Sequence, residues 1–70
     1  MPKIVKVIEV LSQSDTSWED AAQQAVTLAA QSLRNIRSIY IKEFEATVEN
    51  DKITQFRINA KISFDLERTE

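Results

Sequence analysis

The sequence predicts an α+β fold in which a strand, a helix and two long strands follow one another along the chain. Three observations support this prediction. Valine and isoleucine dominate residues 3–11, apolar residues recur every three or four positions over residues 18–33, and apolar and polar residues alternate over residues 53–66. A β-branched run favours a strand, a spacing of three and four favours a helix, and strict alternation favours a half-buried strand. We expect residues 1–70 to form one domain.

Apolar side chains occupy both faces of the first predicted strand, residues 3–11. Lys6 and Glu9 are the charged residues that interrupt the apolar run from position 4 to position 11. A strand that is apolar on both faces is expected to be buried on both sides. The interruptions exclude the uninterrupted apolar core of a signal peptide, and the run is shorter than the about 20 residues of a membrane span. We therefore expect a soluble, cytoplasmic protein with no membrane partner.

A polar loop over residues 12–15 precedes the predicted helix. Thr16 is the expected N-cap, with Glu19 three residues later completing a capping box, and Asp20 adds a second negative charge where the helix dipole favours it. The apolar face of residues 18–33 is rich in alanine, which lets a helix lie close to a sheet. Because the chain has no glycine, Asn35 is the expected left-handed residue at the end of the helix.

Two long strands, residues 36–48 and 53–66, are predicted to form a hairpin around an Asn50–Asp51 turn. The alternation in the second of them runs for about a dozen residues, which exceeds the usual strand of about five or six. The first strand most simply joins the same antiparallel sheet. The apolar even positions of the last strand are Phe56, Ile58, Ala60, Ile62, Phe64 and Leu66.

The composition excludes several classes of function. The chain has no cysteine, histidine or glycine, and its 9 Lys+Arg against 11 Asp+Glu give a net charge of -2. Thiol and Cys/His zinc sites, a Ser-His-Asp triad and phosphate-binding glycine loops are therefore excluded, and the charge does not favour nucleic acid. Nothing indicates an activated nucleophile or an acid–base pair, so we expect a protein that is not an enzyme.

One helix is too short to cover the predicted sheet. A helix of about sixteen residues is roughly 24 Å long, whereas strands of about thirteen residues reach roughly 43 Å. Tyr40, Phe44 and the second face of the first strand therefore need other cover, and disulfides are not available to a chain without cysteine. Small domains without disulfides or a structural metal often depend on association with further copies for their stability. We expect an obligate homo-oligomer.

The chain resembles the dodecins, a family of small flavin-associated proteins. The resemblance rests on the opening stretch through Glu9 and Val10 and on three segments, Thr-Ser-Trp-Glu-Asp-Ala-Ala at 16–22, Leu-Arg-Asn-Ile at 33–36 and Ala-Lys-Ile-Ser-Phe-Asp-Leu at 60–66. It implies a three-stranded antiparallel sheet wrapped around one helix. It also implies a hollow, spherical homododecamer that binds or stores a small ligand.

Two positions depart from the pattern of the flavin-binding members. Those members place a tryptophan, which stacks on the flavin ring, at the position that corresponds to Ser38, and a glutamine at the position of Arg57. Serine offers no aromatic face, and stacking is worth about 1–3 kcal/mol per ring. The resemblance therefore implies flavin affinity that is weakened by about one to three decades, or lost.

The sequence leaves open which ligand the protein binds and which residues bind it. A repositioned pocket, with Tyr40 or Arg57 compensating, would keep riboflavin or FMN binding, and Arg57 is also placed to pair with a neighbouring subunit. The start of the helix is similar to a branch of the family without flavin, for which calcium association has been proposed. A calcium-binding or purely structural assembly that holds no organic ligand is therefore a further alternative. Trp18 is expected to pack against the loop and the sheet rather than to line a ligand pocket. The candidate oxygen ligands for calcium are Glu43, Glu45, Glu49 and Asp51.

Overall fold

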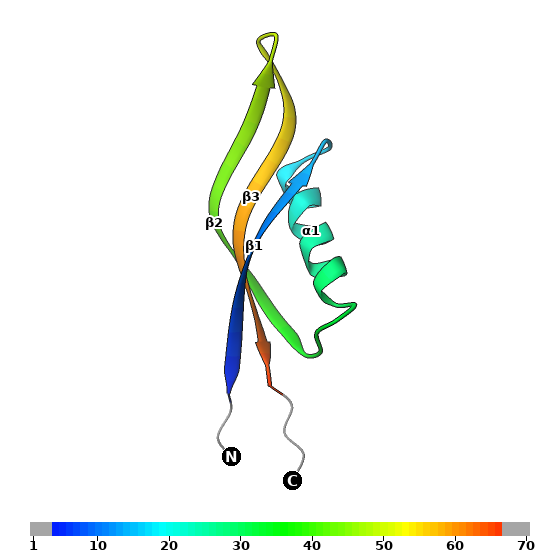
Figure 1. Ribbon diagram of the computed structural model, residues 1–70, viewed down its shortest axis with the longest axis vertical. Coiled ribbons are helices and arrows are strands. Elements are labelled where there is room, and N and C mark those ends of the chain that lie inside the picture. The colour runs from blue at the N-terminus through cyan, green and yellow to red at the C-terminus, as the bar shows by residue number, and fades with distance from the viewer. Residues whose placement is uncertain (1–3, 67–70) are drawn as a thin grey trace.

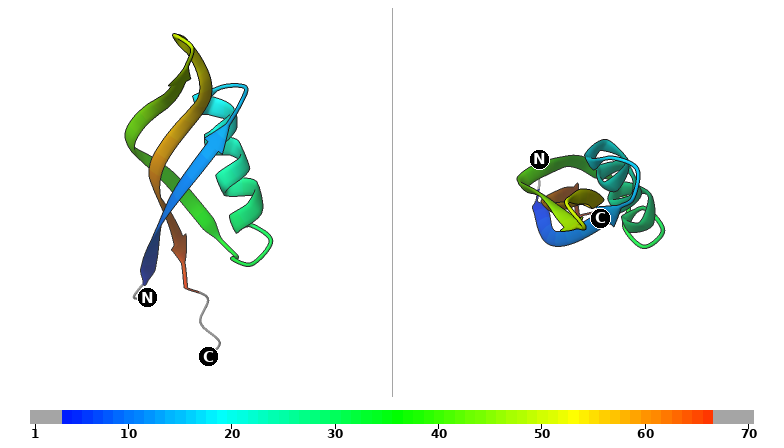
Figure 2. Two further views of the ribbon diagram at one scale, coloured as in Figure 1. Left: turned by 45° about the horizontal axis from the view of Figure 1, so that its top comes forward. Right: turned by 90° about the horizontal axis from the view of Figure 1, so that it is seen from above.

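A computed structural model describes residues 4–66 and shows the predicted order of elements. The elements are β1 (Val5–Ser14), α1 (Trp18–Ala29), β2 (Ile36–Glu49) and β3 (Lys52–Asp65). The three strands form one antiparallel sheet in the order β1-β3-β2, and α1 lies against one face of it (Figure 1). Seen from above, the sheet curls and the helix lies to one side (Figure 2).

The central strand β3 owes its position to its alternating pattern. Ile58, Ala60 and Ile62 are at most 1% exposed, and Ile58 and Ala60 pack against Ala21 of α1, which is fully buried. We call the face of the sheet that carries α1 the inner face and the opposite one the outer face. The even positions of β1, and of β3 from Phe56 onward, point to the inner face, because side chains alternate along a strand and these segments pair in one unbroken register.

The side chains of β2 do not alternate evenly between the two faces, because the strand carries extra residues at Arg37 and Lys42. The register passes from Ile41 opposite Ala60 to Glu43 opposite Asn59, so Lys42 has no partner in β3. Such a bulge shifts the side-chain alternation by one residue. Ile41 points to the inner face before the bulge and Phe44 does so after it, and this change of parity was not predicted from the sequence.

The start of the helix differs from the prediction. Ser17, not Thr16, is the N-cap, and its Oγ accepts a hydrogen bond from the Asp20 backbone N–H at 2.9 Å. Ser14, only 5% exposed, accepts hydrogen bonds from the Thr16 and Ser17 backbone N–H groups and donates one to Asp20 Oδ2 at 2.6 Å. The strand β1 therefore continues to Ser14 and includes residues predicted as loop, because this network joins its end directly to the helix.

The helix ends at Ala29, earlier than the predicted end near residue 33. The Gln31 and Ser32 backbone N–H groups donate to Leu28 O and Ala29 O, which closes the chain into a turn. The left-handed conformation predicted for Asn35 is confirmed (φ 63°), although it directly precedes β2 rather than capping α1. The predicted hairpin turn is also confirmed, since Asn50 and Asp51 have φ values of 52° and 66°, as a type I′ turn requires.

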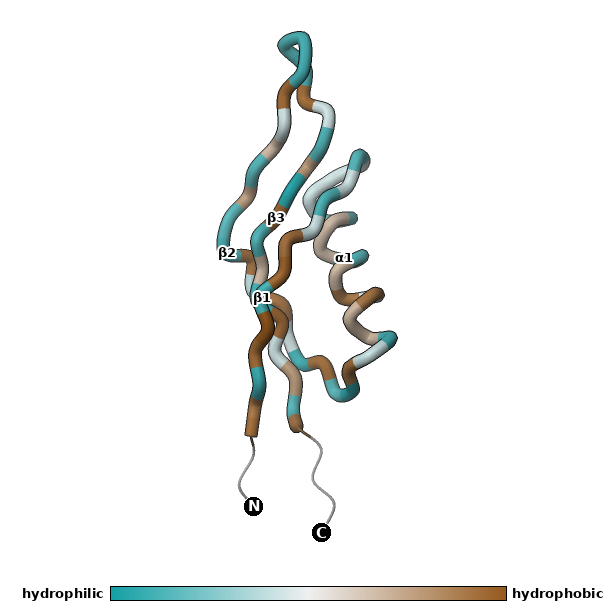
Figure 3. The backbone as a smooth tube through the Cα atoms, viewed as in Figure 1, coloured by the Kyte–Doolittle hydropathy of each residue, from teal (hydrophilic) through white to brown (hydrophobic). Residues whose placement is uncertain are grey.

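The molecule is elongated and leaves much apolar surface uncovered. It measures 57 × 20 × 13 Å, and its radius of gyration of 14.7 Å exceeds the about 11 Å of a compact chain of this length. Apolar segments follow β1 and reappear beside the hairpin turn (Figure 3). The exposed large apolar side chains are Ile4, Val5, Val7, Leu11, Leu28, Tyr40, Phe44, Val48, Ile53 and Leu66.

The prediction that β1 is buried on both sides is wrong for a single chain. Val5, Val7 and Leu11 on the outer face are 50%, 51% and 71% exposed, because β1 is an edge strand and α1 covers only the inner face. Within residues 4–66, the helix is too short and too polar to cross a membrane.

Candidate functional site

The candidate ligand residues Ser38 and Tyr40 lie on the outer face near the start of β2. Ser38 is exposed and its Oγ lies 2.5 Å from Ser63 Oγ on β3. Tyr40 lies opposite Lys61 and is 64% exposed. Across β3, the register places Val7 of β1 opposite Ser63. This part of the outer face therefore combines a hydrogen-bonded hydroxyl pair, an exposed phenol and uncovered apolar surface.

Arg57, the third candidate, lies on the same face but far from Ser38. Its position is six residues from Ser63 along β3, which corresponds to about 20 Å. Its Nε and Nη2 donate to Gln13 Oε1 at 3.0 and 2.8 Å, and its Nη1 lies 3.5 Å from Glu45 Oε1. Arg57 thus bridges all three strands within its own chain. A pocket that contains both Ser38 and Arg57 needs side chains from two copies.

Trp18 lies on the inner side, away from the Ser38 region. Its ring makes edge-on contacts with Phe56 and Phe44, at centroid distances of 4.9 and 6.0 Å. Its Nε1–H donates to the Glu45 backbone carbonyl at 2.9 Å. The predicted packing of Trp18 against the sheet is confirmed, and this packing fixes the first turn of α1 against β2 and β3.

A charged cluster crosses the middle of the outer face. Lys42 Nζ donates to Glu9 Oε2 at 3.1 Å, so the ion pair reaches from β2 over β3 to β1. This hydrogen bond and the Lys42 charge lower the pKa of Glu9 below its ordinary 4.5, with smaller contributions from Lys61 and Asn59. The same bond raises the pKa of Lys42 above 10.5. Sequence reasoning missed this cluster because the position of Lys42 relative to Glu9 depends on the register of all three strands.

The lowered pKa of Glu9 predicts a loss of stability in acid. A depressed carboxyl pKa contributes stability above the unfolded value near 4.5, and this contribution disappears as the pH falls through the folded pKa. We expect the thermal midpoint of the protein to fall below pH 4.5, and the fall to be smaller in Glu9→Gln. Melting curves measured across this range test it, with Glu49→Gln beside the hairpin turn as the control. Identical pH profiles for Glu9→Gln and the unmodified protein would contradict the assignment.

The four candidate calcium ligands do not gather in one chain. Glu43 and Glu45 are both on the outer face of β2, whereas Glu49 and Asp51 lie at the hairpin turn. Residues 4–66 contain no group of three or more carboxylates arranged to hold a metal. One feature does suit a cation, since the buried Oδ1 of Asn59, opposite Glu43, has no hydrogen-bond partner within these residues.

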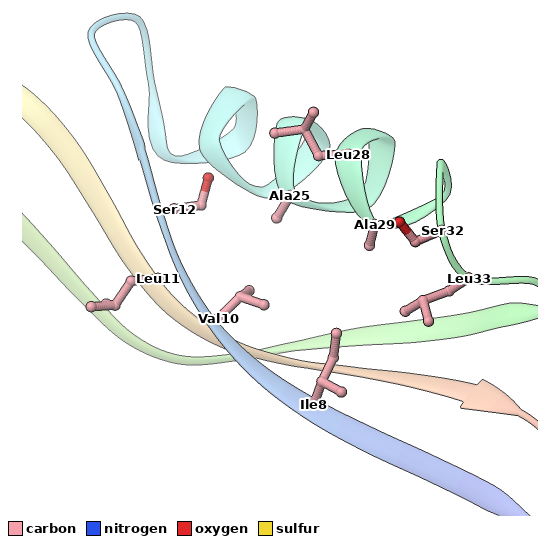
Figure 4. A pocket seen from close by; sticks show the side chains of 9 residues that line it. All are labelled: Ile8, Val10, Leu11, Ser12, Ala25, Leu28, Ala29, Ser32 and Leu33. Atoms are coloured by element: carbon pink, nitrogen blue, oxygen red, sulfur yellow. The ribbon is translucent and has the colours of Figure 1, made fainter.

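A groove of about 440 Å³ separates the second half of α1 from β1 (Figure 4). Ala25 and Ala29 line it from the helix, and Ile8 and Val10 line it from the strand. The alanine side chains are too short to fill the space between these elements. We call this feature the helix groove; Leu11, Ser12, Leu28, Ser32 and Leu33 complete its lining.

Comparison with known proteins identifies relatives over nearly the whole chain. The Dodecin family model matches residues 4–67. The calcium dodecin of Mycobacterium tuberculosis is 36% identical over 61 residues, which are 87% of this chain and 86% of the relative. The dodecin of Thermus thermophilus is 28% identical over 69 residues, 99% of this chain and 100% of the relative.

Solved structures of the same two proteins share the fold. The calcium dodecin structure has a TM-score of 0.79 at 33% identity and covers 96% of both chains. A tryptophan-to-phenylalanine variant of the Thermus thermophilus dodecin has a TM-score of 0.91 at 25% identity and covers 96% of this chain and 100% of its own. The sequence is thus more similar to the calcium dodecin, and the backbone is more similar to the Thermus protein. Because sequence and backbone match along the same length, this chain belongs to the dodecin family.

Proposed function

We propose that this protein is a non-enzymatic, cytoplasmic homododecamer that binds or stores a small ligand, and that its affinity for flavin is weakened or lost. The observation that carries the proposal is the hydroxyl pair of Ser38 and Ser63 at the start of β2. A stacking tryptophan is expected at the first of these positions in flavin-binding relatives. A serine hydrogen-bonded to a second serine provides neither an aromatic face nor a base-activated nucleophile.

The distribution of aromatic rings supports weak flavin binding. Among residues 4–66, Tyr40 is the aromatic residue of the outer face, whereas the phenylalanines of β2 and β3 and Trp18 lie on the inner side. The donors of Arg57 are engaged with Gln13 and Glu45. A repositioned flavin pocket would therefore rely on the phenol of Tyr40.

Titration with riboflavin and with FMN tests the proposal directly, since binding quenches flavin fluorescence. We expect no saturable quenching at sub-micromolar protein. Sub-micromolar binding would contradict the proposal and favour the repositioned pocket, which Tyr40→Ala should then abolish. Tyr40→Phe is the matched control, because it keeps the ring and removes only the hydroxyl.

Calcium binding is a second candidate function. It is supported by the unpartnered Asn59 Oδ1 beside Glu43 and by the similarity to a protein named calcium dodecin. Carboxylate and amide oxygens are the ligands that Ca²⁺ prefers. Because residues 4–66 of one chain lack a third grouped carboxylate, such a site would take further ligands from a second copy.

Calcium at about 100 times its dissociation constant is expected to stabilise the assembly by about 2.7 kcal/mol, and magnesium is expected to do less. Thermal melts with each ion, and with a chelator, measure this effect. Glu43→Gln should reduce the calcium response, whereas Glu19→Gln on α1 should leave it unchanged. A melting temperature that does not change when calcium is added would contradict calcium binding.

A further inference from the structure

A pocket of about 440 Å³ lies on the outer face of the sheet, beyond the Ser38 region. Leu11 of β1, Asn59 of β3 and Glu43 of β2 line it in one row, because the register places Leu11 and Glu43 on either side of Asn59. Glu45, and Phe44 between the two glutamates in the chain, complete the lining. We call this feature the outer pocket. It has an apolar wall on one side of β3 and an acidic wall on the other.

The lining of the outer pocket carries two carboxylates and no cationic side chain. The charge of Glu45 is partly balanced, since Arg57 Nη1 lies 3.5 Å from its Oε1. Glu43 forms no ion pair of this kind within residues 4–66. The pocket therefore has a net negative charge at the Glu43 end.

The two lysines nearest the outer pocket lie beside a different carboxylate, that of Glu9. Lys42 Nζ donates to Glu9 Oε2 at 3.1 Å, and Lys61 lies opposite Glu9 in the register of β1 and β3. Both positive charges lower the pKa of Glu9. Glu43 also raises the pKa of Lys42, but by less than Glu9 does. Within this cluster, Glu43 is therefore the carboxylate whose charge is least compensated.

Asn59 brings a hydrogen-bond acceptor without a donor to the same pocket. Its Oδ1 is buried and has no hydrogen-bond partner within residues 4–66. The Asn59 side chain also stabilises the ionised form of Glu9 through a hydrogen bond. A carboxylate can accept only from the amide N–H group, so Nδ2 faces Glu9 and Oδ1 faces away from it. Because a buried acceptor without a donor costs free energy, a ligand N–H group that reaches Oδ1 is favoured.

We propose that the outer pocket binds a small organic ammonium ion, with its –NH₃⁺ group between Glu43 and Asn59 Oδ1 and its hydrocarbon part on Leu11. An ammonium group offers three donors and one positive charge, which suit an uncompensated carboxylate and an unpartnered amide oxygen. Leu11 is 71% exposed, so a hydrocarbon group that covers it removes apolar surface from water. This inference rests on the proposed ligand-binding function and names the class of the ligand.

The apolar wall distinguishes this ligand from calcium. Ca²⁺ takes about six to eight oxygen ligands and gains nothing from a leucine side chain. An organic ammonium ion needs only a few acceptors and also uses an apolar contact, and one copy of the chain supplies both. An anion would place its charge beside Glu43 and Glu45, which repel it.

Isothermal titration calorimetry of the assembled protein with n-hexylammonium tests the inference. We expect saturable binding of n-hexylammonium and none of hexanoate or n-hexanol, which have the same hydrocarbon chain but a negative charge or none. n-Butylammonium should bind more weakly, by about two- to fourfold for each methylene group removed, because less hydrocarbon covers Leu11. This series uses the unmodified protein throughout.

Two pairs of variants assign the two walls. Glu43→Gln should weaken the binding of n-hexylammonium by about tenfold or more, whereas Glu19→Gln on α1 should leave it unchanged. Leu11→Ser should weaken the binding of n-hexylammonium without changing the response to calcium. Leu11→Met keeps an apolar side chain and should bind n-hexylammonium as the unmodified protein does.

The outcomes separate this inference from the proposed function. No binding of n-hexylammonium at millimolar concentrations, equal binding of hexanoate or n-hexanol, or an unchanged affinity in Glu43→Gln overturns the ammonium site. Each of these results leaves the proposed function standing, since flavin titration tests that separately. A loss in Glu43→Gln without any loss in Leu11→Ser overturns the organic ligand in favour of a simple cation. If Leu11→Ser does not assemble, equal affinities for n-hexylammonium and n-butylammonium overturn it instead.

Discussion

Replacing Ser38 with tryptophan is expected to raise the affinity for FMN by about thirtyfold to twenty-thousandfold. A stacked ring contributes about 1–3 kcal/mol, so rings from two copies contribute about 2–6 kcal/mol, and a factor of ten in affinity corresponds to about 1.4 kcal/mol. Ser38 is exposed, and within residues 4–66 its side chain is hydrogen-bonded to Ser63. The larger side chain therefore displaces no packed neighbour. Fluorescence titration of the variant and the unmodified protein measures the change.

Two controls locate the origin of that gain. Ser38→Ala removes the hydroxyl without adding a ring and should leave FMN binding as weak as before. Glu43→Trp adds a ring on the same face and the same strand, but beyond the bulge, and should give no comparable gain. An unchanged affinity in Ser38→Trp would mean that the outer face lacks the remaining geometry of a flavin pocket, and the account of weakened flavin binding would be wrong.

Truncating Ile58 to alanine is expected to lower the free energy of unfolding by about 2–5 kcal/mol. Ile58 is 1% exposed and belongs to the small cluster between α1 and β3, with Ala21 and Ala60. Few other buried side chains contribute to the core, and the whole free energy of unfolding of a folded protein is only about 5–15 kcal/mol. The cavity therefore removes a large fraction of the stability. Urea unfolding at a fixed protein concentration measures it.

Lys61→Ala is the matched control for the truncation of Ile58. Lys61 lies on the same strand, three residues away and on the exposed outer face, so its replacement should change stability by less than about 0.5 kcal/mol. Ile58→Val, which removes one methyl group, should cost about 0.5–1.5 kcal/mol. Equal losses of stability in Ile58→Ala and Lys61→Ala would contradict the assignment of Ile58 to the buried core.

The elements with a simple periodicity could be predicted from the sequence. The alternation around Ile58 identifies the central strand because β3 is flanked on both sides and buries one face. Asn50 and Asp51 identify the hairpin turn because both adopt the left-handed conformation that asparagine and aspartate tolerate. The order of the four elements follows from these local signals.

Features that depend on tertiary contacts could not be predicted in this way. Ser17 became the N-cap in place of Thr16 because the buried Ser14 accepts both backbone donors that precede the helix. The end of α1 at Ala29 reflects the return of the chain to the sheet, although Ala30 and Gln31 are good helix formers. The bulge at Lys42 carries no local sequence signal.

The candidate site was predictable only in part. The resemblance to dodecins directs attention to Ser38, and the structure places that residue beside Ser63 on the outer face. It does not reveal that Arg57 is about 20 Å away along β3 and bound to Gln13 and Glu45. Periodicity assigns residues to faces, but the positions along two paired strands depend on their register.

The central claim is that one chain has more apolar surface than its own helix covers, so that copies must cover one another. Light scattering over a dilution series, combined with thermal melts at each concentration, tests it most directly. We predict a mass many times 8.0 kDa at high concentration and an unfolding midpoint that falls on dilution. A particle of 8.0 kDa that stays folded, with a midpoint independent of concentration, would contradict the claim.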